Sequence, residues 1–314
     1  MNSLIVAYLL DLILGDPQWQ NHPVRIIGRM ITKLEKKLNR PQGNKFFRGL
    51  ILVLIVAGAA FSAVWGSLKL AGLLHPVFHF LLSLLFIYFG LSVKDLAVQA
   101  NKVKLALARK DILQARKNLS LIVGRDTDKL DEPEIVRAAV ETVAESIMDG
   151  IVAPLCYCFL GGPALMWLYK AVNTLDSMVG YRSARFMQFG KAAAKLDGIL
   201  NFIPARITSF LIGIAGLAGK RDRFGAFKWG FRYFFKAPEF NSQIPESAMA
   251  GALGVQLGGE NFYNSIAVSK ALMGNNLEPL EIKHIQQSIK ISYLCSVLTV
   301  ISGIFLKLTI EKFL

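Results

Sequence analysis

Four charged side chains recur at four-residue intervals within residues 131–150. They are Arg137, Glu141, Glu145 and Asp149, and most residues between them are Val, Ala, Ile and Met. On an α-helix this interval keeps the side chains close to one face. One interpretation is a solvated face with supporting Arg–Glu pairs. The apolar remainder of the helix favours another, in which the stripe lines a polar cavity or a metal site.

Acidic residues are also concentrated in the turn before this helix. Asp126 and Asp128 follow Arg125, but the calcium-loop pattern of Gly at the sixth and Glu at the twelfth position is missing. Oxygen ligands of this kind suit Mg²⁺ held together with substrate phosphates. Ordinary turn and capping chemistry is the alternative. The candidate metal ligands are Asp126, Asp128, Glu141 and Glu145.

The expected helix has recognisable ends. Asp131 with Glu134 three residues later is a capping box, and Pro133 suits a first turn. Gly150 is the residue type that ends helices. We therefore expect the helix to begin after Asp131 and to end near Gly150.

A second polar group lies beside another apolar run. Lys170, Asn173 and Asp176 share a helical face if this segment is helical. Charged groups there are costly unless they are paired or functional. Further polar residues follow in Arg182, Asp197 and Arg206, although Arg206 could simply extend to the membrane interface.

Two loops resemble anion-binding cradles, at residues 15–25 and 241–259. Backbone N–H groups at a helix start can hold phosphate. Tight packing of small residues is the favoured alternative for Gly251 and Gly254. No Walker A loop is present, so the sequence identifies no ATP-binding loop.

Composition places these groups in a membrane protein. The 314 residues are 53% hydrophobic and 18% charged, with a net charge of +14. This excludes a disordered chain and is too apolar for an ordinary soluble domain. The basic residues cluster beside apolar runs, which favours a membrane surface over nucleic acid. We expect no nucleic-acid partner.

Five apolar runs predict an all-α, polytopic membrane bundle of about four to six membrane helices, some of them re-entrant, with cytoplasmic helical segments. The expected runs are 50–68, 76–93, 151–172, 202–218 and 291–306, with a half-buried helix at 1–14. Gly161-Gly162-Pro163 interrupts the third run. Strict alternation of sides would place 173–201 outside, whereas re-entrant half-helices would return that segment to the inside.

We expect one membrane-embedded domain over 1–314. Its predicted parts are 1–48, an N-terminal helix and basic cytoplasmic segment; 49–93, a transmembrane hairpin; 94–150, cytoplasmic helices with the acidic stripe; 151–219, broken membrane helices; 220–289, a basic and Gly-rich cytoplasmic segment; and 290–314, a C-terminal membrane helix.

The sequence resembles the CbiB/CobD family, the adenosylcobinamide-phosphate synthases of cobalamin biosynthesis. The similarity runs nearly end to end and includes DLILGDPQWQNHPVRIIGRMI, VGRDTDKLDEPEIVRAAVETVAESIMDGIVAPL, YKAVNTLDSMVGYR, FGKAAAKLDGILNFIPARIT and NSQIPESAMAGALGVQLGG. Two positions depart from the family pattern. Ser146 stands where Asn is usual, and Gly198 replaces an Asp.

The resemblance implies a multi-pass protein of the bacterial inner membrane with a cytoplasmic active site. It implies an ATP- and Mg²⁺-dependent ligase that joins adenosylcobyric acid to (R)-1-amino-2-propanol O-phosphate or an analogue. Membrane lipid and other membrane enzymes of the pathway are further expected partners.

Within that chemistry the charged residues receive roles by hypothesis. The expected catalytic residues are Glu141, Glu145, Asp149, Asp176 and Asp197. The expected phosphate or carboxylate clamps are Arg25, Arg125, Lys170, Arg182 and Arg206. Two rival hypotheses remain: a transporter or binding protein for an anionic or corrinoid ligand, and a membrane scaffold for other enzymes.

Overall fold

The protein is described here from a computed structural model. The described residues are 1–17, 19–40, 43–181, 183–217, 222, 224–235, 241–263 and 265–313. Among them, five helical stretches are long and apolar enough to cross a bilayer: Lys45–Leu74, Pro76–Ala108, Glu132–Val179, Lys191–Gly216 and Ile282–Phe313. The expected all-α membrane architecture is confirmed, and the chain is a multi-pass membrane protein.

The chain divides into two compact units, each built from separated segments. Unit 1 comprises Met1–Ser92, Ala153–Phe202 and Ser302–Leu314. Unit 2 comprises Val93–Val152 and Ile203–Ile301. Two helices contribute to both units, α9 (Lys191–Gly216) and α12 (Ile282–Phe313).

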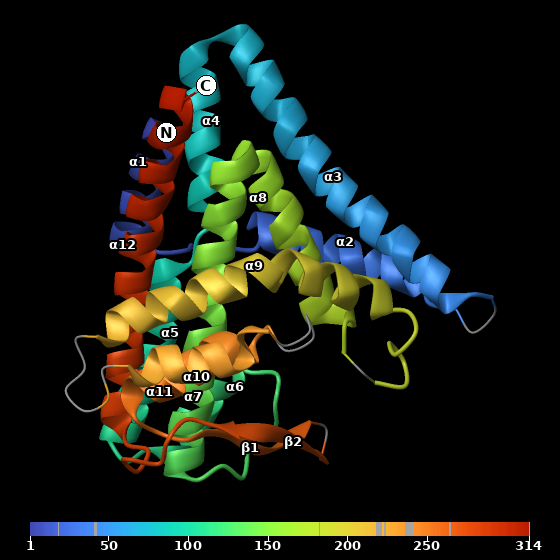
Figure 1. Ribbon diagram of the computed structural model, residues 1–314. Helices are drawn as coiled ribbons and strands as arrows, with labels where there is room; N and C mark the ends of the chain where they lie inside the picture. The colour runs from blue at the N-terminus through green and yellow to red at the C-terminus, as the bar shows by residue number, and fades with distance from the viewer. Residues whose placement is uncertain are drawn as a thin grey trace. The chain divides into compact units, whose positions relative to one another are not determined.

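Unit 1 contains α1 (Asn2–Leu14), α2 (Pro23–Leu38), α3 (Lys45–Leu74), α4 (Pro76–Tyr88) and α8 (Ala153–Val179). Helices α3 and α4 form a helical hairpin and are joined through His75, whose side chain accepts a hydrogen bond from Val77 N–H (Figure 1). The expected N-terminal helix, α1, is partly buried and packs on α4.

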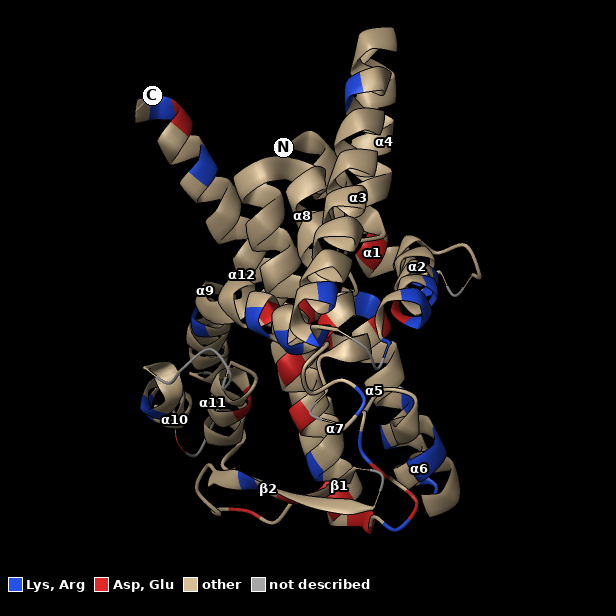
Figure 2. Ribbon diagram, turned by 90° about the vertical axis from the view of Figure 1, so that its right-hand side faces the viewer, with Lys and Arg blue, Asp and Glu red and all other residues tan. Residues whose placement is uncertain are grey.

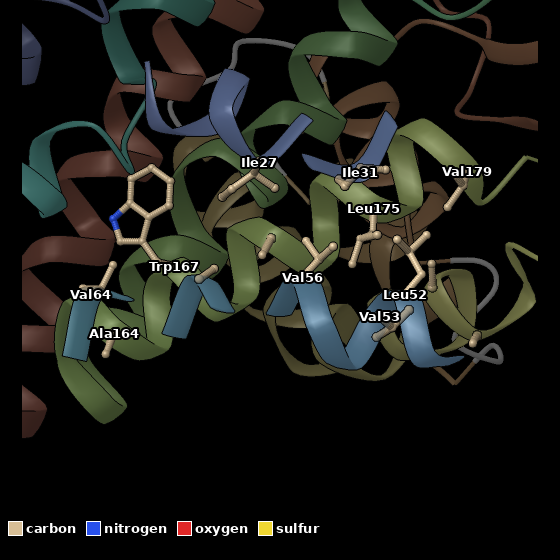
Figure 3. Close-up of a cluster of buried hydrophobic side chains, with 14 of the residues drawn as sticks. Ile27, Ile31, Leu52, Val53, Val56, Val64, Ala164, Trp167, Leu175 and Val179 are labelled. Atoms are coloured by element: carbon tan, nitrogen blue, oxygen red, sulfur yellow. The ribbon is translucent and has the colours of Figure 1, made fainter. Parts of the chain in front are cut away.

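The core of unit 1 is a cluster of aliphatic side chains around one tryptophan. Ile27 and Ile31 of α2 meet Leu52 and Val56 of α3, and Trp167 of α8 closes the cluster (Figure 3). The indole N–H of Trp167 donates to the carbonyl of Phe86 at 2.9 Å, which satisfies its buried polar atom.

Helix α8 is broken where the sequence predicts a break. Gly161 and Gly162 have non-helical dihedral angles, with φ of +69° at Gly162, and the helix bends sharply there (Figure 1). Glycine tolerates this left-handed backbone, and Pro163 suits the first turn of the second half.

Unit 2 contains α5 (Val93–Ala108), α6 (Ile112–Ser120), α7 (Glu132–Ile147), α10 (Gly225–Phe234) and α11 (Gln243–Leu253). The expected capping box of α7 is confirmed, because the side chain of Asp131 accepts from Glu134 N–H and that of Glu134 accepts from Asp131 N–H, both at 2.9 Å. The expected helix end at Gly150 was wrong. A π-helical turn, η1 (Met148–Val152), carries the helix on into α8.

A β-hairpin in unit 2 was not predicted from the sequence. Strands β1 (Leu257–Tyr263) and β2 (Ile266–Met273) pair antiparallel (Figure 1). Gly254 ends α11 in the left-handed conformation. A Cβ on Gly258 would lie 2.2 Å from the carbonyl oxygen of Ala271, so only glycine fits this irregular start of the pairing.

Small residues of α11 pack tightly against a neighbouring helix, as the alternative to an anion-binding cradle predicted. A Cβ on Gly251 would lie 2.2 Å from the carbonyl oxygen of Gly225, at the contact between α10 and α11. Glycine therefore lets the two backbones approach closely.

Candidate functional site

Glu141 is the buried centre of the polar network in unit 2. It lies on α7, where Figure 2 shows acidic residues following one another along the helix, and only 1% of its surface is exposed. Its Oε2 pairs with the guanidinium of Arg125, and its Oε1 accepts from Gly258 N–H at 2.8 Å. Both carboxylate oxygens are therefore already engaged by groups of the protein.

The loop before α7 is attached to the β-hairpin. Arg125 also donates to the side-chain oxygen of Asn261. Asp126 accepts from Ser265 N–H at 2.7 Å, and its own N–H donates to the carbonyl of Phe262 at 2.8 Å. Residues 125 and 126 thus hold the hairpin against the acidic stripe.

Arg137 anchors the same hairpin from α7. Its guanidinium donates to the carbonyls of Gly258 and Glu260, the latter at 2.9 Å. The first member of the stripe is therefore a structural clamp between a helix and a strand.

Glu246 and Lys270 form an ion pair that the sequence analysis did not single out as a site. Glu246 lies on α11 with no exposed surface, and its Oε1 is 3.1 Å from Nζ of Lys270 on β2. Burial, together with the negative charges of Glu141 and Glu145, raises the pKa of Glu246 to about 8, although Lys270 opposes the shift. Despite its burial, Lys270 has a raised pKa because Glu246, Glu145 and Glu141 favour its charged form. The sequence feature that could have indicated this ion pair is the single acidic residue in the otherwise small and apolar segment PESAMAGAL.

The proposed metal ligands do not form a protein-only cage. Among the described residues, no three His, Cys, Asp or Glu side chains lie close enough to hold a metal ion together. Asp128 is exposed, and Asp126 caps the hairpin turn. Glu145 and Asp149 are half-buried on the stripe. Mg²⁺ commonly uses one or two carboxylates plus substrate phosphates, and these two residues fit that requirement.

Arg206 does not extend to an interface as its alternative interpretation proposed. Only 8% of its surface is exposed, and it donates to the side chain of Asn241 at 3.2 Å. Its guanidinium also lies over the ring of Phe234, 5.6 Å from the centroid. Arg206 thus ties α9 to the segment before α11.

Unit 1 contains a small polar pocket that includes two of the expected clamps. Arg25 and Lys170 line it together with Asp16, His22 and Ser92, and its volume is about 220 Å³. His22 shapes the pocket, because its Nδ1 accepts from Val24 N–H at the start of α2 while its Nε2 lies 3.0 Å from Asp16. The turn-rich loop at 15–25 therefore does contribute to a cavity with basic side chains.

Asp197 is held by amide groups from two helices. Asn173 of α8 donates to its Oδ1 at 3.3 Å, and Asn201 of α9 donates to its Oδ2 at 3.0 Å. The hydroxyl of Tyr169 in turn donates to Asn201 at 2.9 Å. This chain of hydrogen bonds fixes a half-buried carboxylate beside Asn173, which lies one helical turn from Lys170 on α8.

Two expected site residues remain to be placed. Asp176 is half-buried on α8 and its carbonyl accepts from Gly180 N–H, whereas Arg182 lies outside the described residues. The expected site residues that are described fall into two groups, one in each unit. Unit 1 holds Arg25, Lys170, Asp176 and Asp197. Unit 2 holds Arg125, Asp126, Asp128, Glu141, Glu145, Asp149 and Arg206.

Apolar spans with buried ion pairs and a polar pocket define a multi-pass membrane protein with internal polar sites. A family model described as CobD/Cbib protein matches residues 4–292. The chain belongs to the CobD/CbiB family, whose members are cobalamin biosynthesis proteins, and it acts in that process.

Curated relatives extend over almost the whole chain. The cobalamin biosynthesis protein CobD of Geobacter metallireducens is 45% identical over 92% of this chain and 91% of its own length. CobD of Clostridium perfringens is 40% identical over 99% of both chains, and CbiB of Salmonella typhimurium is 40% identical over 93% of both. No solved structure matches the chain significantly.

Proposed function

We propose that this protein is the ATP-dependent amide ligase that joins adenosylcobyric acid to (R)-1-amino-2-propanol O-phosphate, or a close analogue. Its product is adenosylcobinamide phosphate. Membership of the family supports the pathway, and the resemblance of the polar motifs supports the reaction. The observation that carries the site is the unit 1 pocket, which Arg25 and Lys170 line together with the carboxylate of Asp16.

The volume of the pocket selects between the two organic substrates. About 220 Å³ is smaller than the 300–1,000 Å³ usual for drug-sized ligands. A corrinoid is far larger than that, whereas an amino-alcohol phosphate is small. The phosphate dianion would bind the basic side chains of Arg25 and Lys170, with the hydroxyl of Ser92 as a further partner.

The reaction needs an activated carboxylate and a neutral amine. The terminal phosphoryl group of ATP passes to a carboxylate oxygen, giving an acyl phosphate and ADP. The amine then attacks the carbonyl carbon, the C–O bond to phosphate breaks, and inorganic phosphate leaves. The attacking ammonium loses two protons, of which one leaves with the phosphate and one reaches solvent.

Fixed carboxylates of unit 1 suit the proton transfer. Asp197 keeps its orientation through hydrogen bonds from the side chains of Asn173 and Asn201. A positioned carboxylate can accept the proton of the attacking ammonium. Asp176, on the same helix as Lys170, is the second candidate for this role.

The acidic stripe of unit 2 suits the nucleotide part of the reaction. Glu145 and Asp149 would contribute carboxylate oxygens to Mg²⁺, which neutralises charge on the transferring phosphoryl group when bound. Glu141 acts through Arg125 and Gly258 N–H, so we assign it a positioning role for the stripe and the hairpin.

A ligation assay in detergent tests the proposed reaction. Purified protein is mixed with adenosylcobyric acid, the amino-alcohol phosphate, ATP and Mg²⁺, and the amide product is measured by mass spectrometry. We expect one ADP per amide. Because detergent micelles have no second compartment, product formation excludes pure transport, whereas its absence in folded protein would support the transporter or the scaffold hypothesis.

Variants of the pocket test the site. Lys170→Ala and Arg25→Ala should raise KM for the amino-alcohol phosphate about tenfold or more, since each removes a charge-assisted interaction worth roughly 1.5–3 kcal/mol. KM for ATP should change little. Lys33→Ala, an exposed basic residue on α2, is the matched control. Equal KM values in all three variants would remove this pocket from the proposal.

A further inference from the structure

A larger hollow lies in unit 1 where the α3–α4 hairpin turns. Its volume is about 780 Å³, and α3, α4, α8 and α12 all contribute to its lining. None of the residues discussed as catalytic or binding groups lines it. The hollow is therefore a separate feature from the small polar pocket.

Three basic side chains line the hollow. Lys69 of α3, His79 of α4 and Lys307 of α12 line the hollow, and none of its described lining residues is acidic. The ammonium of Lys69 also lies over the ring of Trp65, 5.7 Å from the centroid. Grouped basic residues on otherwise apolar helices are costly in a membrane unless an anion or water meets them.

The break in α8 adds backbone donors to the same hollow. Gly161, Gly162, Pro163 and Ala164 all line it, and they form the start of the second half of α8. The N-terminus of this long half-helix presents free N–H groups and a partial positive charge. A Cβ on Gly162 would meet nothing within 4 Å, so this turn faces open space.

The depth of the hollow matches a membrane interface. Helix α3 has 30 residues and is about 45 Å long, against about 30 Å for the hydrocarbon core. Trp65 and Lys69 lie within its last ten residues, the depth at which Trp and Lys anchor helices at the interface.

We propose that this hollow binds the phosphate headgroup of an anionic phospholipid. The phosphate would meet Lys69, Lys307 and the N–H groups that follow the Gly-Gly break, while the acyl chains would lie along the apolar faces of α3 and α4. The proposal does not depend on the ligase assignment.

Lipid binding is measured on the whole protein after delipidation. Phosphatidylglycerol or phosphatidylcholine is added in mixed micelles, and bound lipid is counted by native mass spectrometry. We expect one phosphatidylglycerol per chain at concentrations where phosphatidylcholine does not bind. At about 1 kcal/mol for each basic residue near the surface, K69Q/K307Q should weaken binding roughly 25-fold.

The double variant K45Q/K312Q is the matched control. It removes the same charge from the same two helices but lies outside the hollow, so it should bind phosphatidylglycerol like the parent. Equal weakening in the two double variants would overturn the proposal. So would equal retention of the two lipids, or full displacement of phosphatidylglycerol by equimolar inorganic phosphate.

Discussion

The ammonium nitrogen of Lys270 on β2 lies 3.1 Å from a carboxylate oxygen of Glu246, a side chain on α11 with no exposed surface. This pair links the unexpected hairpin to the small-residue helix, next to the acidic stripe of α7. The ion pair therefore holds strand β2 against α11 through a buried acidic side chain.

Breaking this pair from one side should be costly. Above about pH 8, where Glu246 is ionised, Lys270→Met leaves its carboxylate buried without a partner, and we expect a loss of about 3–5 kcal/mol of stability. In E246Q/K270M both charges are gone and the loss should be smaller. Thermal unfolding in detergent, followed by circular dichroism, measures both. A double variant as unstable as K270M would show that packing, not charge, determines the effect.

The same pair predicts a pH dependence. The pKa of Glu246 is raised from 4.5 to about 8, so the folded state favours its protonated form. Its contribution to stability is fully present below about pH 4.5 and is lost as pH rises towards 8. Glu246→Gln removes this titration. The Tm of the parent relative to the variant should fall between pH 5 and pH 8.5, and a constant difference would contradict the raised pKa.

Arg125 should control the order of the β-hairpin. Its guanidinium contacts both Glu141 and Asn261, so Arg125→Met removes one link to the hairpin and leaves Glu141 without its cationic partner. We expect faster amide hydrogen exchange across residues 257–273. Lys129→Met, an exposed change in the same loop, is the control. Unchanged exchange in Arg125→Met would show that Arg137 and Asp126 suffice to hold the strands.

Close packing of α12 on α8 predicts that replacing two helical glycines by alanine changes the stability of the protein by different amounts. A Cβ on Gly303 would lie 2.0 Å from the ring of Phe159, whereas one on Gly58 would meet nothing within 4 Å. Gly303→Ala should therefore lower stability by about 1–3 kcal/mol. Gly58→Ala should be neutral or slightly stabilising, because alanine is the better helix former. Equal Tm values would argue against this helix contact.

The amide clamp on Asp197 predicts a loss of activity with retained folding. In Asp197→Asn the side chain loses its charge but keeps one oxygen for Asn173 or Asn201. If Asp197 accepts the proton, the rate of ligation should fall about 100-fold or more at unchanged KM. Ligation rates and KM values decide this, with Tyr169→Phe as a control that perturbs the same network without removing the carboxylate. Near-parental kcat would assign the role to Asp176.

Much of the architecture followed from periodicity and from residues with strong local preferences. Runs of apolar residues predicted the spanning helices. A long apolar segment enters the bilayer, and there the backbone can form all its hydrogen bonds within one segment only as a helix. Gly161-Gly162-Pro163 predicted the break in α8, and Asp131 with Glu134 predicted the start of α7, because both depend on neighbours a few positions away.

Other features depended on partners distant in the sequence. Gly150 has the chemistry of a helix end, yet a π-helical turn continues into α8 through packing that local propensity does not contain. The hairpin at 257–273 was missed because its glycines and exposed side chains give little strand signal, while its order comes from Arg125 and Arg137.

For this protein, the sequence by itself determined the membrane class, the family and the chemical types of the polar groups, because composition and motif order are local properties of the chain. Only the tertiary structure decided which charge meets which. Glu141 is paired with Arg125, Glu246 with Lys270, and Asp197 with two amides, since a buried charge takes whatever partner the packing of distant segments brings within hydrogen-bond distance.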